Sequence, residues 1–272
     1  MVFADGQDPT GTATGHGVRS ELMNFFWKLL FVLLFASTGA FAAEEGVKLD
    51  RAPIDEHNII SLQRGAKVFV NYCLNCHSAN YMRYNRLEDL GLTEQQIRDN
   101  LIFTGAKIGD LMKVAMDPKD SKKWFGAAPP DLTVEARARS SSAGSGADWM
   151  YTYLRSFYRD PSRPTGWNNV VYPNVAMPHV LWQLQGQQVL KDEQVPGPGY
   201  MKTEQKLVLD KPGTMTPIEY DEMVADLVNY MAYMAEPARQ ARKTLGIYVL
   251  LFLGVMFIFA YLLKKEYWKD VH

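Results

Sequence analysis

Two segments of the chain repeat apolar residues at the spacing of an amphipathic helix. In residues 61–72 the pattern is carried by Leu62, Ala66 and Val70, behind Ser61, which can cap the amides of a first turn. Residues 217–236 begin with a proline and end before another. Their apolar face comprises Met223, Leu227, Tyr230 and Met234. We predict that both segments are helices packed in a core.

The region between these helices is broken repeatedly by proline. A serine- and glycine-rich stretch, residues 140–146, predicts a flexible link, and residues 148–158 predict a short aromatic helix. No run alternates apolar and polar residues over six or more positions, so no strand is predicted. The expected fold is therefore mainly α with long loops. Loops of this length need something to pack on, and a bound cofactor is one candidate.

Two apolar runs lie near the two ends of the chain. Residues 245–263 hold 19 residues without a charge, which is enough for a helix to cross ~30 Å of hydrocarbon. This run predicts a transmembrane anchor. Lysines and arginines flank it equally on both sides, so charge alone does not orient it.

The first apolar run, residues 25–36, has the length of the hydrophobic region of a signal peptide. Ala40 and Ala42 then supply the small residues that signal peptidase reads, so we expect residues 1–42 to be an extension plus signal peptide. Residues 1–22 are unusually polar for such a peptide, and a translation start at Met23 would give an ordinary one. A retained N-terminal anchor is the alternative. Export places residues 43–244 outside the cytoplasm and leaves residues 264–272 as a cytoplasmic tail.

Charge narrows the range of functions. The 272 residues contain 29 lysines and arginines against 30 aspartates and glutamates, a formal net charge of −1. There is no overall basic field to attract nucleic acid, so we expect no nucleic-acid partner.

Both cysteines of the chain belong to one short motif. Cys73, Cys76 and His77 form C-x-x-C-H, the attachment pattern of c-type haem. The two thiols can form thioethers with one porphyrin, and the histidine that follows can ligate its iron. A disulfide would close a very small loop, a thioredoxin-like pair would need a βαβ pattern, and structural zinc would need further ligands nearby. We therefore predict one covalent haem c.

The second axial ligand is harder to predict, because the chain has 13 methionines. Six are explained by packing or by the anchor: Met223, Met231 and Met234 on the second helix, Met112 and Met116 in a stretch expected to be helical, and Met256 in the apolar anchor. Met177 differs, since it lies in a non-helical segment that Pro173 and Pro178 make stiff. We predict Met177 as the distal ligand, with His179 as the alternative.

Two arginines, Arg137 and Arg139, follow a Pro-Pro-Asp-Leu segment at residues 129–132. Arginine pairs with carboxylates in bidentate geometry, and a buried haem carries two propionates. Solvation at the surface is the simpler interpretation of these charges.

The order of motifs resembles the cytochrome c1 family of bacterial cytochrome bc1 complexes. The shared features, over essentially the whole mature chain, are CLNCHS at residues 73–78, APPDL at 128–132, RAR at 137–139, SRPTGWNN at 162–169, the Met-Pro-His loop at 177–179, MAEP at 234–237 and one C-terminal span. The histidine of the Met-Pro-His loop departs from the family pattern. Both cysteines are committed to haem, so none remains for the disulfide of larger members.

This resemblance implies a cytochrome c-like helical domain around one covalent haem c, in the periplasm, anchored in the bacterial inner membrane beside cytochrome b. It implies that electrons arrive from the Rieske iron-sulfur protein and leave to a c-type cytochrome. Carried over by position, Cys73 and Cys76 are the thioether sites, His77 and Met177 the iron ligands, and Arg139 a propionate partner. The chain would be a subunit of ubiquinol:cytochrome c oxidoreductase that does not bind quinol. A membrane-tethered cytochrome serving as an electron shuttle or as a terminal-oxidase subunit is the alternative.

Overall fold

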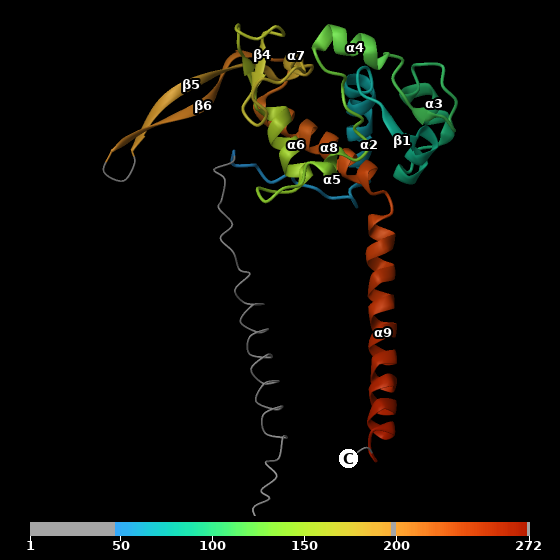
Figure 1. Ribbon diagram of the computed structural model, residues 1–272. Coiled ribbons are helices and arrows are strands. Elements are labelled where there is room, and N and C mark those ends of the chain that lie inside the picture. The colour runs from blue at the N-terminus through green and yellow to red at the C-terminus, as the bar shows by residue number, and fades with distance from the viewer. Residues whose placement is uncertain (1–46, 197–199, 271–272) are drawn as a thin grey trace, which may run out of the picture. The chain divides into compact units, whose positions relative to one another are not determined.

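The computed structural model describes residues 47–196 and 200–270 (Figure 1). The expected signal peptide at residues 1–42 lies outside the described residues and stays a prediction.

Two helices cross at the centre of the fold. Helix α2 (Ile59–Val68) and helix α8 (Pro217–Ala235) correspond to the two predicted amphipathic helices. The side chain of Asn58, rather than the predicted Ser61, caps α2, and Thr216 caps α8 in a capping box. At the crossing, a Cβ atom on Gly65 would overlap the carbonyl oxygen of Asp226. Glycine therefore permits the close approach of the two helices.

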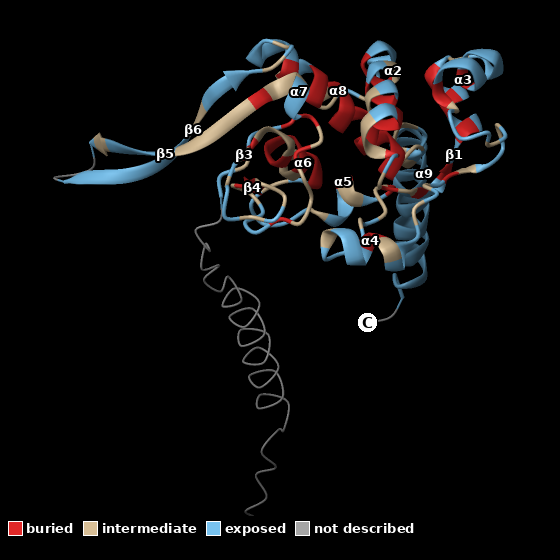
Figure 2. Cartoon of the chain, turned by 90° about the horizontal axis from the view of Figure 1, so that it is seen from above, coloured by how far each residue is buried: buried red, intermediate tan, exposed pale blue. Residues whose placement is uncertain are grey.

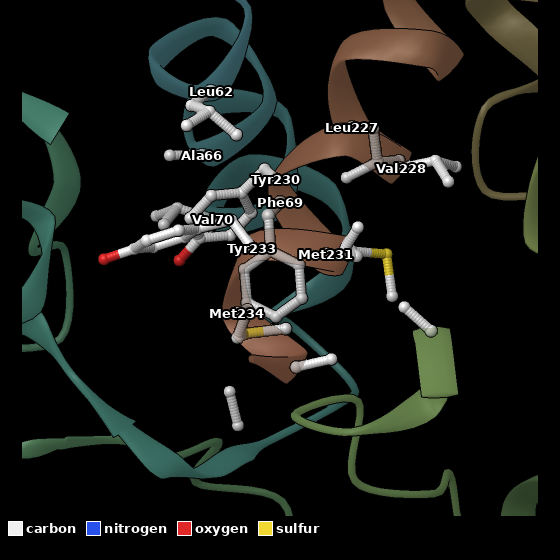
Figure 3. Packing of buried hydrophobic residues seen from close by; sticks show 14 of the residues in the cluster. Leu62, Ala66, Phe69, Val70, Leu227, Val228, Tyr230, Met231, Tyr233 and Met234 are labelled. Carbon is white, nitrogen blue, oxygen red and sulfur yellow. The ribbon is translucent and has the colours of Figure 1, made fainter. Parts of the chain in front are cut away.

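Figure 3 shows the apolar contact between α2 and α8. Phe69 is fully buried, and its ring lies 5.6 Å from that of Tyr230, centroid to centroid. The methionines of α8, which the sequence assigned to packing, are all buried here: Met223, Met231 and Met234. The core is therefore formed between residues that are some 160 positions apart in the chain.

Helix α2 runs directly into a π-helical turn, η1 (Phe69–Cys73), where the sequence predicted one continuous helix. Shorter helices follow: the 3₁₀ helix η2 (Tyr84–Leu90), α3 (Glu94–Leu101), α4 (Pro118–Phe125), α5 (Glu135–Ala138), α6 (Gly146–Arg155) and α7 (Trp182–Gln185). The chain between them is mostly loop. The prediction of a mainly α fold is confirmed.

In the part of the chain that the structure describes, three antiparallel strand pairs interrupt the helices. They are β1 (Ala79–Arg83) with β2 (Leu111–Met112), β3 (Phe157–Arg159) with β4 (Trp167–Asn169), and β5 (Gly186–Pro196) with β6 (Met201–Pro212). Met112 is buried in β2 and Met116 lies in a loop, so the helix expected around them was wrong although Met112 does pack in the core. The predicted aromatic helix is α6, but it ends at Arg155 because β3 begins two residues later.

The pair β5 and β6 was missed in the sequence. Its strands are 11 and 12 residues long and form a two-stranded ribbon, most of whose outer half is exposed in Figure 2. Since both faces of the outer ribbon contact solvent, neither face requires apolar residues, and the alternation that identifies a half-buried strand does not arise.

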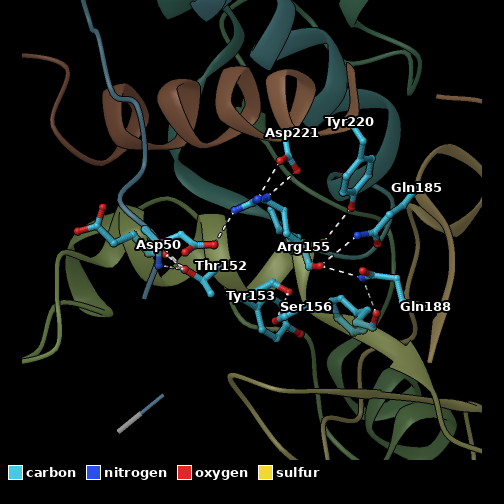
Figure 4. Close-up of polar contacts among 12 residues, drawn as sticks. Asp50, Thr152, Tyr153, Arg155, Ser156, Gln185, Gln188, Tyr220 and Asp221 are labelled. Atoms are coloured by element: carbon cyan, nitrogen blue, oxygen red, sulfur yellow. Dashed lines mark hydrogen bonds and ion pairs between the residues drawn. The ribbon is translucent and has the colours of Figure 1, made fainter. Parts of the chain in front are cut away.

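Arg155 ties the end of α6 to several other segments (Figure 4). Its guanidinium donates to both carboxylate oxygens of Asp221, at 2.6 and 2.8 Å, and to Asp50 at 2.8 Å. Its backbone carbonyl accepts hydrogen bonds from Gln185 and Gln188. Arg155 thus connects the end of α6 to the start of α8, to the segment around Asp50 and to the base of the β5–β6 ribbon.

Helix α9 (Arg239–Tyr267) contains the predicted anchor and extends six residues before and four residues after it. It has 29 residues, none of them buried, and within the described part of the chain it is the helix long and apolar enough to cross a membrane.

Candidate haem site

A cavity of about 280 Å³ brings together residues from distant parts of the sequence. The residues predicted from the sequence to hold a haem all line it: Cys73, Cys76, His77, Arg139 and Met177. Much of the remaining lining is apolar or aromatic, including residues 127–130 and 175–178. The cavity therefore offers two thiols, an imidazole and a thioether to a single apolar space.

His77 is placed by the turn that ends η1. Its backbone amide donates to the carbonyl of Cys73 at 2.9 Å. The ring nitrogen Nδ1 lies 2.8 Å from the carbonyl oxygen of Pro130, which can only accept, so Nδ1 carries the proton and donates. Burial lowers the pKa of His77, and the bond to Pro130 opposes this effect. The outcome is a neutral imidazole whose Nε2 lone pair is free for a metal.

The two cysteines are free in this structure. Burial, together with a smaller contribution from the neighbouring Cys76, raises the pKa of the Cys73 thiol to about 12. Burial also raises the pKa of Cys76. Both side chains are therefore neutral thiols in this cavity.

Met177 and His179 lie two residues apart but differ in their surroundings. Met177 lines the cavity, and its sulfur accepts a hydrogen bond of 3.3 Å from the Tyr153 hydroxyl. His179 is 2% exposed and does not line the cavity; its ring stacks on Phe157 at 4.8 Å and meets Trp167 edge to face at 5.1 Å. Burial lowers its pKa to about 4. Of the two candidates for a distal ligand, the cavity therefore presents Met177.

Arg139 lies at the end of α5. Its Nε donates to Glu135 at 2.7 Å, and its guanidinium carbon lies 4.6 Å from the centroid of the Trp149 ring. Arg137 is exposed and does not line the cavity. Of the two arginines in the motif, Arg139 is thus the one within reach of a group held in the cavity, while Arg137 is a solvated surface charge.

The donor set fits a covalently attached haem. An oriented neutral imidazole, two thiols, a thioether and a cation line one apolar cavity, and these are the groups that c-type haem attachment, axial ligation and propionate pairing require. Sequence reasoning missed the aromatic contributions of Trp149, Tyr153 and Tyr172. The aromatic composition of α6 was visible in the sequence, but nothing in it indicated which face would line a site.

Comparison with known proteins gives a consistent result. The model of the Cytochrome C1 family matches residues 50–271. A protein of Nitrosomonas europaea named ammonia monooxygenase gamma subunit is 56% identical over 90% of this chain and 97% of its own length. Cytochrome c1 of Allochromatium vinosum is 53% identical over 88% of this chain and 96% of its own. Cytochrome c1 of Rhodospirillum rubrum is 30% identical over 77% and 81% of the respective chains.

Proposed function

The chain belongs to the cytochrome c1 family, and we propose that its one covalent haem c is ligated by His77 and Met177 and attached through Cys73 and Cys76. As a member of this family it is an electron-transfer haem subunit of the cytochrome bc1 complex, anchored by its C-terminal helix. The observation that carries the ligand assignment is that all four side chains line the same cavity.

The bound haem supplies one-electron redox chemistry, because its iron cycles between the ferric and ferrous states. The chain's own residues do the rest. The Pro130 carbonyl fixes the ring orientation of His77, and the Tyr153 hydroxyl contacts the sulfur of Met177. Arg139 binds Glu135 through Nε alone. The other nitrogens of its guanidinium would be available to pair with a haem propionate.

We further propose the direction of electron flow and the orientation in the membrane. Electrons come from the Rieske iron-sulfur protein and leave to a c-type cytochrome, with residues 43–244 in the periplasm and residues 264–272 in the cytoplasm. The chain is part of ubiquinol:cytochrome c oxidoreductase, and oxidation of quinol takes place on other subunits. Cytochrome b is the expected neighbour of helix α9 in the bilayer.

Purification of the tagged chain from gently solubilised membranes tests the assembly. Recovery of cytochrome b and a Rieske protein with a haem-staining band of this chain is the expected result. Recovery of the haem protein alone would support a tethered electron shuttle, and recovery with oxidase subunits would support a terminal-oxidase role. Recovery with monooxygenase subunits, as the name of the Nitrosomonas relative would suggest, would likewise overturn the proposal.

Optical spectroscopy tests the ligands. We expect the ferric protein to show an absorption band at about 695 nm, the sign of methionine sulfur bound to haem iron, here called the methionine–iron band. A chain without this band whose reduced form readily binds carbon monoxide would show that Met177 is not a ligand. The purification result and the spectrum are independent, so the assembly and the ligand assignment can fail separately.

A further inference from the structure

We propose that Asn168 and Asn169 are positioning residues that hold the loop carrying Met177, and with it the sulfur, against the end of helix α6. This inference rests on the proposed role of Met177 as the distal ligand. Both asparagines lie at the end of strand β4 and are buried, with Asn169 fully inaccessible and Asn168 7% exposed. Polar side chains buried to this extent must be explained by the partners that they bind.

Asn169 uses both ends of its amide. The carbonyl oxygen accepts from the backbone amides of Val171 at 2.9 Å and Tyr172 at 3.1 Å, and from the hydroxyl of Ser156 at 3.2 Å. The NH₂ group donates to the backbone carbonyl of Tyr153 at 2.8 Å. One side chain thus connects the first residues of the loop to the last turn of α6.

Asn168 holds the loop at a second point, closer to the ligand. Its carbonyl oxygen accepts from the backbone amide of Asn174 at 2.8 Å, and its NH₂ group donates to Asp160 at 2.9 Å. Asn174 has a φ of 64°, a left-handed conformation that few residues other than glycine adopt. Arg163 supports this residue with bonds of 3.0 Å to its side-chain oxygen and to its backbone carbonyl.

The loop from residue 170 to residue 180 has no helix or strand of its own. The amides of Val171, Tyr172 and Asn174 donate to the two asparagine side chains, where a helix or strand would supply backbone carbonyls. Tyr172 and Asn174 are exposed and Val171 is half-buried, so without the asparagines these amides can bind solvent instead. Loss of the asparagines therefore releases the loop from its anchors while leaving the helical core intact.

The same contacts lead to the sulfur. The backbone carbonyl of Tyr153 accepts a hydrogen bond from the side-chain NH₂ group of Asn169, and the Tyr153 hydroxyl donates to Met177 Sδ at 3.3 Å. Its ring also stacks on Trp149 at 4.8 Å. Asn169 thus links the backbone of the residue that contacts the sulfur to the loop that carries the sulfur. This arrangement limits how far the thioether can move from the position in which it ligates iron.

The test compares two buried asparagines in the haem-loaded, full-length protein. Asn169→Leu removes the loop anchor. Asn229→Leu is the matched control, because Asn229 is 1% exposed and bonds to Asp55 and Ser61 but does not line the cavity. The methionine–iron band and the global unfolding transition, followed by far-ultraviolet circular dichroism, are recorded against temperature in the same samples.

Both variants should unfold at a lower temperature than the parent. Only Asn169→Leu should lose the band before it unfolds and bind carbon monoxide in the reduced state. If the band in Asn169→Leu persists up to its own unfolding transition, as in Asn229→Leu, the asparagine is merely structural and the inference is wrong. A parent without the band would instead refute the assignment of Met177.

Arg163→Gln provides a second variant that leaves the buried asparagines in place. It removes the two bonds to Asn174 and should also lower the temperature at which the band is lost, relative to global unfolding. If Asn169→Leu cannot be produced with haem bound, Arg163→Gln tests the inference in its place. The inference is wrong if the interval between loss of the methionine–iron band and global unfolding is the same in Arg163→Gln as in the parent.

Discussion

The hydrogen bond from Tyr153 to Met177, the proposed distal ligand, should raise the reduction potential of the haem. A donor at the sulfur withdraws electron density, so the thioether becomes a weaker donor to ferric iron and the ferrous state is favoured. A neutral hydrogen bond contributes a net ~0.5–1.5 kcal/mol, and thioether sulfur is a weak acceptor, which favours the lower half of that range. Only the part of this energy that differs between the ferric and ferrous states changes the potential. Since ~1.4 kcal/mol corresponds to ~59 mV for one electron, Tyr153→Phe should lower the potential by at most about 20–40 mV.

The assay is an equilibrium redox titration of the purified complex, followed at the α-band of this haem. Tyr220→Phe is the matched control: it loses a 2.8 Å bond from a buried tyrosine hydroxyl to the Leu154 carbonyl, but Tyr220 does not line the cavity. It should therefore leave the potential unchanged. An unchanged or raised potential in Tyr153→Phe, with the methionine–iron band intact, would refute the reasoning about the sulfur.

Three further predictions concern the ligand, the helix crossing and the response to acid. Met177→Leu should abolish the methionine–iron band and allow the reduced haem to bind carbon monoxide, as followed by optical spectroscopy. Gly65→Ala should destabilise the protein by about 1–3 kcal/mol in thermal unfolding, because the added Cβ overlaps the Asp226 carbonyl. Burial opposes the ionisation of Asp148, but hydrogen bonds led by that of the Ser145 hydroxyl outweigh it and hold its pKa below the ordinary value. Its contribution to stability is therefore present above the unfolded pKa of about 3.9 and lost as the pH falls through the lower folded value; Asp148→Asn should remove this component from the acid-unfolding curve.

Features that depend on neighbouring residues were predicted correctly from the sequence. Helices α2 and α8 follow from apolar residues at helical spacing, and the proline at the start of α8 marked its beginning. The apolar run at residues 245–263 identified α9 in the same way. In each case the signal is contained within one segment, so no knowledge of tertiary contacts was needed.

Features set by distant contacts or by solvent were missed. The turn η1 replaces the last turn of the predicted helix, although its residues have no unusual propensity. The ribbon of β5 and β6 has two largely exposed faces and hence no periodic pattern. Met112 lies in a two-residue strand whose partner is β1, more than 25 residues earlier in the chain. A single segment contains no signal for any of these pairings.

The two sides of the candidate site differ in the same respect. On the proximal side, Cys73, Cys76 and His77 lie within five residues, so one turn of backbone places them and the motif alone identifies them. On the distal side, the position of Met177 depends on α6 and on the end of β4, which are brought to the loop only by the tertiary fold. The sequence therefore allowed Met177 to be predicted as the distal ligand, but it did not identify the side chains that hold the Met177 loop in place. Substitutions on the proximal side should abolish haem attachment or ligation outright, whereas substitutions in the distal anchors should produce graded changes in band stability, because several weak bonds share the task.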